Sequence, residues 1–341
     1  MENLLKELLD ASGVSGYENE IGQVICRELK KSCGQVDIDG FGNVIAKKGS
    51  GPKKIMLAAH MDEIGFVVKH ISKEGYVYFI KIGGIDDRIL PAQRVVIKSK
   101  SGDVHGVIGA KPPHLQKDEE RKHPLKYEDM YIDIGAKSKE EALKRIAIAD
   151  SIIFYPNSGV LNDKLYFGKA VDNRVGCYAL LKIMEKINVN AEVYAVATAQ
   201  EEVGLKGART AAFKINPDFA IAIDTTMAGD TPGINEKETS LKLGEGVALT
   251  TIEASGRGII VPARIKDMLI ETAKSNNIKF QMDVVEGGMT DGAMIYMNRE
   301  GVLTAVLSIP TRYVHSSTSV FSIDDVTSAV ELAIKVVEKV A

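Results

Sequence analysis

The chain has 341 residues, of which 45% are hydrophobic and 26% are charged, and its formal net charge is −3. This length is enough for one large domain or for two domains with cores of their own. The small net charge argues against nucleic acid or a membrane surface as a partner, and no apolar run approaches the ~18 residues that span a bilayer.

The N-terminal part of the chain begins with helix and strand patterns. Four leucines share one face of a helix predicted over residues 2–11: Leu4, Leu5, Leu8 and Leu9. A second helix is predicted over 18–31, and a hairpin turn over 39–43 joins two short strands. A buried strand over 54–59 then leads into His60, Asp62 and Glu63.

The cysteines and the first residues bear on the location of the protein. The N-terminus lacks the basic start and the cleavage site of a signal peptide. The cysteines are odd in number and have no paired spacing: Cys26, Cys33 and Cys177. We therefore expect reduced thiols and a cytoplasmic protein.

The pattern changes between residues 66 and 161, where short strands alternate with glycine turns. Strands are predicted over 66–68, 76–80, 94–97, 104–108 and 152–155. A mixed charge run over 117–123 is interpreted as a solvated mobile loop, because the acids within it do not suit a nucleic-acid patch. We expect a small β-rich unit here.

Beyond residue 161 helix and strand patterns alternate again. Strands are predicted over 192–199, 219–223, 247–252, 280–285 and 302–309. Helices are predicted over 173–187, 208–214, 262–275 and 324–340, with a short one after 287–292. This alternation predicts an α/β catalytic domain made of residues 1–65 and 162–341 and interrupted by an inserted β-rich domain of residues 66–161.

The strand predicted over 192–199 leads directly into Glu201 and Glu202. It is apolar on both faces, which is typical of a strand buried on both sides, and ligands of open α/β sheets bind at the carboxyl ends of such strands. Two neighbouring acids there cost desolvation free energy unless a positive charge is near, and the run contains no Lys or Arg. A metal ion would supply that charge.

Other acids and imidazoles also follow predicted strands. These are His60 with Asp62 after 54–59, Asp224 after 219–223 and His315 after 302–309, while Asp172 precedes a helix. Singly, each has an ordinary explanation, since Asp172 can cap the helix and Asp224 can be a turn residue. If the strands share a sheet, however, all these side chains converge on one rim, and this repetition favours a functional site.

Three carboxylates and two imidazoles have the composition of a two-metal site: Asp172, Glu202, Asp224, His60 and His315. With one bridging hydroxide, the negative charges balance two divalent cations. Mixed nitrogen and oxygen ligands without a thiolate favour Zn²⁺, Co²⁺ or Mn²⁺ over a structural zinc site.

Asp62 and Glu201 then take catalytic roles. Asp62 lies two residues beyond His60, on the same side of an extended backbone, where it can accept the other imidazole N–H and fix the tautomer. Adjacent residues near a strand end point in different directions. Glu202 would therefore bind metal, while Glu201 acts as the general base that takes the proton of an activated water and passes it to the leaving amine.

Over essentially its whole length, the chain resembles the tetrahedral, dodecameric metallo-aminopeptidases. That family includes glutamyl, leucyl, lysyl and deblocking aminopeptidases, and some relatives are catalogued as endoglucanases. The motifs that carry the resemblance follow one another at residues 12–16, 39–43, 59–63, 111–114, 133–136, 170–174, 200–204, 224, 287–291 and 314–316. Met289 stands where a glycine is more typical, and this departure bears on side-chain preference rather than on chemistry.

The resemblance implies a mixed-sheet α/β/α zinc-exopeptidase-like domain interrupted by a barrel-like or PDZ-like dimerisation domain. It implies that Asp172 bridges two metals, that His60 and Asp224 complete one site, and that the other is completed by the pair Glu202 and His315. Short peptides would be the substrates, and six dimers would form a hollow dodecamer whose active sites face an inner chamber.

The substrate preference is predicted from residues 287–291, which no Lys or Arg adjoins, although Arg299 and Arg312 are near in sequence. We expect a broad preference for neutral and apolar, leucyl-type N-terminal residues. A glutamyl-, aspartyl- or lysyl-selective aminopeptidase is the alternative within the family.

Three other functions remain open from the sequence. A glycosidase would need two carboxylates on either side of the scissile bond, which the neighbours Glu201 and Glu202 do not suit, and it would leave His60 and His315 unused. A deacylase or carboxypeptidase would keep the metal chemistry and change the substrate. A binding or scaffold protein would keep the fold without activity.

Overall fold

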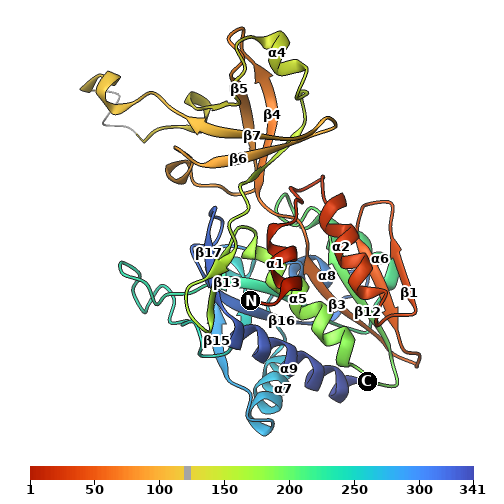
Figure 1. Ribbon diagram of the computed structural model, residues 1–341. Helices are drawn as coiled ribbons and strands as arrows, with labels where there is room; N and C mark the ends of the chain where they lie inside the picture. The colour runs from red at the N-terminus through yellow and green to blue at the C-terminus, as the bar shows by residue number, and fades with distance from the viewer. Residues whose placement is uncertain (119–123) are drawn as a thin grey trace.

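The computed structural model describes residues 1–118 and 124–341 of the chain. Figure 1 shows an α/β domain and, set apart from it, a smaller β-barrel domain. The predicted fold class, an α/β domain interrupted by a β-rich domain, is therefore confirmed. The mobile loop predicted over 117–123 falls mainly on residues 119–123, which lie outside the described part of the chain.

The barrel domain is a closed sheet with the strand order β4-β5-β8-β7-β6-β9. Its strands are β4 (Gly65–Ile71), β5 (Val77–Ile82), β6 (Arg94–Ser99), β7 (Gly102–Gly109), β8 (Tyr131–Asp133) and β9 (Ser151–Phe154), and the helix α4 (Lys139–Leu143) lies between β8 and β9. Phe66 packs edge-to-face against Phe79 and Phe154 in its core. The paired neighbours β4 and β9 carry the chain into and out of the barrel. The insertion predicted over 66–161 overruns this unit at its end, because residues 159–160 pair within the sheet of the α/β domain. We therefore propose that the insertion ends before residue 159.

The α/β domain is built on one large mixed sheet with the order β1-β2-β12-β3-β13-β16-β17-β11-β10, and β14 pairs with both β16 and β15. Its strands are β1 (Gln35–Ile38), β2 (Val44–Lys48), β3 (Lys54–His60), β10 (Gly159–Val160), β11 (Leu165–Gly168), β12 (Glu192–Thr198), β13 (Phe219–Met227), β14 (Val247–Ile252), β15 (Phe280–Val284), β16 (Leu303–Arg312) and β17 (Ser319–Ser322).

Helices cover both faces of this sheet. The first face is covered by α5 (Val171–Lys186), α7 (Ala263–Ser275) and α9 (Ile323–Val340), and α1 (Asn3–Asp10) and α2 (Asn19–Leu29) pack on α5. On the opposite face lie α6 (Lys206–Ile215) and α8 (Gly292–Ile295). The central strands are buried from both sides, which explains why 54–59 and 192–199 are apolar throughout.

The parallel strands β12, β3, β13 and β16 position the site because their registers bring their carboxyl ends to one edge. Thr198 of β12 pairs with His60 of β3, and Asp224 of β13 pairs with Ser308 of β16. The strand predicted to end at residue 223 continues for four more residues, because β13 stays paired with β16 as far as Met227 and Thr311. Asp224 is therefore a strand residue and not a turn residue.

Two other sequence-based expectations concern the thiols and the membrane. Cys26, Cys33 and Cys177 are free thiols, and the latter two are buried. In the described ranges 1–118 and 124–341, no helix has both the length and the apolar character required to cross a bilayer.

Candidate metal centre

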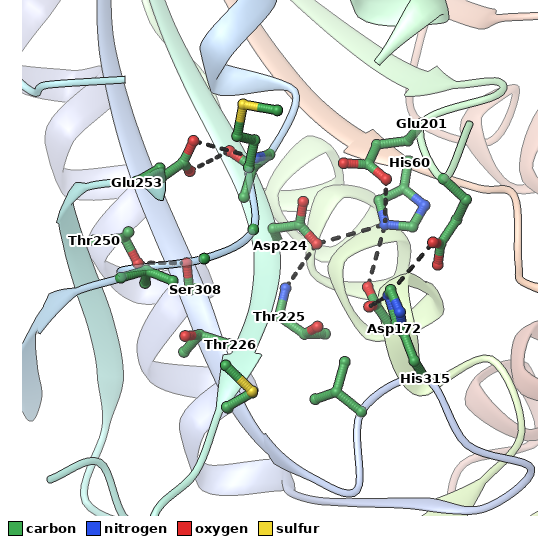
Figure 2. Close-up of a pocket in the computed structure, with 18 of the residues that line it drawn as sticks. His60, Asp172, Glu201, Asp224, Thr225, Thr226, Thr250, Glu253, Ser308 and His315 are labelled. Carbon is green, nitrogen blue, oxygen red and sulfur yellow. Dashed lines mark hydrogen bonds and ion pairs between the residues drawn. The ribbon is translucent and has the colours of Figure 1, made fainter. Parts of the chain in front are cut away.

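The side chains predicted for the metal site gather at the carboxyl edge of the sheet, around one cavity of about 480 Å³. Figure 2 shows five of them approaching one another from separate elements: His60, Asp172, Glu201, Asp224 and His315. His60 ends β3, Asp224 lies in β13, Glu201 and Glu202 follow β12, Asp172 lies near the start of α5, and His315 follows β16. All six line the cavity, so the structure brings together residues that are far apart in sequence.

The carboxylate of Asp172 lies between the two imidazoles. Its Oδ1 is 3.2 Å from Nε2 of His60, and its Oδ2 is 3.3 Å from Nε2 of His315. Asp172 is not the helix N-cap, because that position belongs to Ala170 and its own backbone is not helical. The side chain is therefore free to present one oxygen to each histidine.

The remaining carboxylates surround this trio. The Nε2 atom of His60 is 3.5 Å from Oδ1 of Asp224 and 3.9 Å from Oε2 of Glu201, and Nε2 of His315 is 3.4 Å from Oε2 of Glu202. Ligand atoms of His60, Glu201 and Asp224 lie within 4.8 Å of one another, as do those of His60, Asp172 and Glu202. Both groups have the spacing of donors that can share one cation.

The cluster holds protons tightly. Burial alone lowers the pKa of His315, but the hydrogen bond to Asp172 and the charge of Glu202 outweigh burial and raise this pKa to about 9. Burial and the nearby Asp172 carboxylate raise the pKa of Glu202 to about 8. Burial also raises the pKa of Glu201 well above its usual value. The carboxylates thus require positive charge, which protons provide when no metal is bound.

The donor set fits divalent metal ions. Glu202 Oε1 is buried and has no hydrogen-bond partner, although a buried carboxylate oxygen without a partner is costly. The group contains imidazole nitrogens and carboxylate oxygens and no thiolate, which suits Zn²⁺, Co²⁺ or Mn²⁺. The ring nitrogen that faces the carboxylates is Nε2 in both histidines, so each ring can offer a lone pair to a metal ion once its Nε2 proton has left.

Asp62 lies behind the cavity, fully buried, and contacts three parts of the site. Its Oδ1 accepts a hydrogen bond from the amide of Glu201 at 3.0 Å, and its Oδ2 accepts one from the amide of Glu202 at 3.2 Å. The Nδ1 atom of His60 lies 3.2 Å from the backbone oxygen of Asp62 and 3.5 Å from its Oδ1. The nearer acceptor for His60 is thus the Asp62 main chain, while the carboxylate fixes the backbone of both glutamates.

Sequence reasoning missed two N-terminal residues that support this arrangement. The hydroxyl of Ser15 donates to Oδ2 of Asp62 at 2.6 Å, and Oε1 of Glu18 accepts from the amide of Gln200 at 3.1 Å. Gln200 has a positive φ of 57°, which is unfavourable for a residue with a side chain. Nothing in the local sequence signals these contacts, apart from the presence of Ser15 in a motif that the resemblance singled out.

A buried ionic cluster also holds the segment between His60 and Glu63. The Nζ atom of Lys169 is 2.8 Å from both carboxylate oxygens of Glu63, and Nη2 of Arg174 is 3.3 Å from Oε1. Arg174 also donates from Nε to the carbonyl of Met61 at 2.8 Å. These side chains are almost completely excluded from solvent. His60 and Asp62 therefore lie on a backbone segment that this buried cluster holds in place.

The two arginines considered for a basic pocket do not line the cavity. Arg312 pairs with Asp230, with Nε 2.8 Å from Oδ1 and Nη2 2.6 Å from Oδ2. Arg299 stacks on the ring of Phe213 and donates to its carbonyl oxygen. Among the lining residues that the structure describes there is no Lys or Arg.

Comparisons with known proteins place the chain in a family. A family model described as M42 glutamyl aminopeptidase matches residues 42–332. The lysyl aminopeptidase of Pyrococcus furiosus is 36% identical over 343 residues, which cover 98% of this chain and 96% of that protein.

Solved structures give the same result. A TET aminopeptidase from a marine sediment archaeon of the Thaumarchaeota superposes with a TM-score of 0.95 at 38% identity, covering 98% of this chain and 95% of that one. The TET1 peptidase of Pyrococcus horikoshii, which can assemble into a tetrahedron or a large octahedral shell, superposes with a TM-score of 0.88 at 34% identity and covers 98% of each chain. The protein described here therefore belongs to the M42 family of aminopeptidases.

Proposed function

We propose that this protein is a metallo-aminopeptidase that releases N-terminal residues from short peptides by hydrolysis. The observation that carries the proposal is the position of Asp172, whose two oxygens each face a different histidine. A carboxylate between two imidazoles, with further carboxylates around it, is a suitable bridge between two divalent cations. Membership of the M42 family supports peptides as the substrate class.

Two divalent ions, Zn²⁺ or Co²⁺ and with Mn²⁺ as a further option, would be held by five side chains. Asp172 would be shared, His60 and Asp224 would complete one site, and Glu202 with His315 would complete the other. When bound, ions so placed lower the pKa of a water molecule and polarise the scissile carbonyl. The buried, unpartnered Oε1 of Glu202 supports its assignment as a ligand.

Glu201 is the proposed general base. It is buried at the cavity wall, and burial raises the pKa of its carboxyl well above the usual value, as a proton acceptor that works near neutral pH requires. Glu201 would take a proton from the attacking water and deliver it to the leaving amine. Asp62 would keep the two neighbouring glutamates in separate roles, because it holds both of their backbone amides.

The cavity supports the predicted preference for neutral and apolar N-terminal residues over acidic ones. Its outer walls include Leu205, Met227, Val285, Met289 and Val314, and both nearby arginines are engaged elsewhere. An acidic side chain would have no cation to pair with there. We therefore propose that glutamyl substrates are poor ones for this chain.

We also propose that the chain forms a homo-oligomer built from dimers, with the barrel domain as the dimerisation element and a dodecamer as the complete form. The assembly of the Pyrococcus horikoshii relative supports this. A cytoplasmic location stays a prediction. Light scattering of the purified protein would test the assembly, since a stable monomer or a lone dimer would contradict the dodecamer.

The first experiment is an assay with aminoacyl amides that carry a free N-terminus. The same sample would be tested as purified, after chelation, and after Zn²⁺ or Co²⁺ is added back. We expect hydrolysis that stops with the chelator and returns with metal, and that is faster for leucyl-type residues than for glutamyl ones. Absence of hydrolysis under every metal would overturn the proposed activity, and a glutamyl-over-leucyl preference would overturn the proposed selectivity.

A further inference from the structure

Three hydroxyl side chains form a polar floor in the part of the cavity away from the histidines. They are Thr226 of β13, Thr250 of β14 and Ser308 of β16. Figure 2 shows them on the opposite side of Asp224 from His60 and His315. Ser308 is also the ladder partner of Asp224. The floor therefore lies next to the proposed metal ligand Asp224, on the same edge of the sheet.

A buried carboxylate lies behind the floor. Oδ2 of Asp283, on β15, accepts a hydrogen bond from the hydroxyl of Thr226 at 3.0 Å and another from the hydroxyl of Thr250 at 2.8 Å. Asp283 is only 6% exposed and does not itself line the cavity. Within residues 1–118 and 124–341 it makes no ion pair with a Lys or Arg, so its charge is offset by hydrogen bonds from the two hydroxyls and from the backbone of Val284.

The carboxylate sets the direction in which the hydroxyls point. A carboxylate oxygen can only accept, so Thr226 and Thr250 both direct their protons at Asp283. The hydroxyl of Thr250 has then no proton left for Ser308, whose oxygen lies 2.7 Å away, so Ser308 is the donor of that pair. As a result, all three hydroxyl groups donate their protons within the protein, and their oxygens can only accept hydrogen bonds from a ligand.

The charged side chains described next to the floor are all carboxylates. Glu253 adds a second carboxylate to the same part of the cavity, where its oxygens accept from the backbone and the hydroxyl of Thr290 at 3.1 and 2.6 Å. The walls between the floor and solvent are apolar and include Met227 and Met289. The cavity thus combines an apolar passage with a floor that accepts hydrogen bonds and has negative charge behind it.

We propose that this floor binds the cationic tip of a long N-terminal side chain, so that lysyl residues are substrates alongside the aliphatic ones, with Asp283 as the residue that determines this selectivity. The aliphatic stem of such a side chain suits the apolar walls, and its ammonium group is a donor without acceptor capacity, which matches the hydroxyl oxygens. The inference rests on the proposed aminopeptidase function and extends its preference for neutral residues.

The test compares lysyl amide with norleucyl amide, because norleucine has the same stem without the ammonium group. We expect the metal-loaded wild type to cleave the lysyl amide at least as well as the norleucyl amide. In Asp283→Asn the amide oxygen can still accept from both threonines, so the fold is kept while the charge is lost. The lysyl-to-norleucyl ratio of kcat/KM should then fall about tenfold, which corresponds to about 1.4 kcal/mol.

The matched control is Glu286→Gln, which removes the same charge from an exposed position just after β15 and should leave the ratio within about twofold of wild type. Thr226→Val provides a second variant that keeps the β-branched shape and removes one acceptor, and it should lower the ratio about threefold. An unchanged ratio in Asp283→Asn, or a wild type that cleaves the lysyl amide tenfold more slowly than the norleucyl amide, would overturn the inference alone. Failure of the wild type on leucyl and norleucyl amides would overturn the proposed function instead.

Discussion

The carbonyl oxygen of Gly84, in the barrel domain, lies 2.9 Å from Nδ1 of His315, at the edge of the α/β sheet. A carbonyl oxygen can only accept, so Nδ1 donates to it, and Nε2 is the nitrogen that faces Asp172 and Glu202. The inserted domain therefore determines which nitrogen of a proposed metal ligand is available.

Gly84→Ala should weaken metal binding at the site that contains His315. A Cβ atom at residue 84 would lie 3.1 Å from Nδ1, so the ring must move by a few tenths of an ångström. Loss of an outer partner of a metal-bound histidine typically costs about 10- to 100-fold in affinity, and we expect the lower end of that range. The weaker binding would appear as a lower metal content, measured by elemental analysis after dialysis. Gly34→Ala is the control, because nothing lies within 4 Å of its Cβ, and equal metal loss in both variants would contradict the argument.

Glu201→Gln should retain both metals and lose most of its turnover. The substitution removes the proposed proton acceptor and leaves every proposed ligand in place, so kcat should fall by about 10²- to 10⁴-fold. Glu202→Gln is the matched comparison on the neighbouring residue, and it should lose bound metal as well as activity. If Glu201→Gln lost metal and Glu202→Gln kept it, the two roles would have to be exchanged.

Chelated protein should lose thermal stability as the pH rises from about 6.5 to about 9. The pKa of His315 in the metal-free fold is raised to about 9, so its contribution to the free energy of unfolding is fully present below about pH 6.5 and disappears as the pH passes 9. The pKa of Glu202 is raised to about 8, so the folded state holds this proton more tightly than the unfolded chain, and the stability linked to it is also lost with rising pH.

The measurement for this prediction is the Tm of chelated and metal-loaded protein at a series of pH values. Bound metal replaces the protons, so the loaded protein should show a smaller decrease over the same window. His315→Gln should reduce the decrease in the chelated form. A Tm that is constant or rises between pH 6.5 and 9 in the chelated wild type would show that these two groups do not govern its stability.

Asp62→Asn should reduce kcat by about 10- to 100-fold with a smaller effect on KM. The asparagine amide group must turn a donor towards the backbone N–H of either Glu201 or Glu202, so one of the glutamates is displaced. Asp62 is not a proposed metal ligand, so the variant should keep its metal while kcat falls. Steady-state kinetics combined with metal analysis would therefore distinguish a displaced glutamate from a lost metal ion. Ser15→Ala removes one hydrogen bond to the same carboxylate and should give a weaker effect of the same kind. An unaltered kcat in Asp62→Asn would exclude the positioning role.

The parallel strands and the rim of the candidate site could be predicted from the sequence because both leave local signals. A strand buried on both faces must be apolar throughout, and a polar residue where it stops then stands out, as His60 and Glu201 do. The position of Asp224 inside β13 is not predictable, since the extension of this strand depends on pairing with β16, which the local pattern does not encode.

The parts that could not be predicted depend on contacts between distant segments. The hydrogen bond from Ser15 to Asp62 spans 47 positions, and that from His315 to Gly84 spans 231. The short strands β11 and β17 pair with each other, yet each has only four residues, too few for a clear alternation. Asp283 gave no signal either, because its importance comes from the hydroxyls in front of it and not from its own neighbours in sequence.

The pairing of β4 with β9 means that the barrel domain begins and ends at adjacent points. A connection of this kind allows a domain to be exchanged for another during evolution without disturbing the host sheet. The Gly84 carbonyl makes such an exchange costly in this chain, because a substitute would have to present an acceptor at the same point above His315. Hybrids that combine this α/β domain with the barrel of a relative should therefore fold readily. Their metal retention will depend on whether they keep the loop that follows β5 in this chain, since that loop contains Gly84.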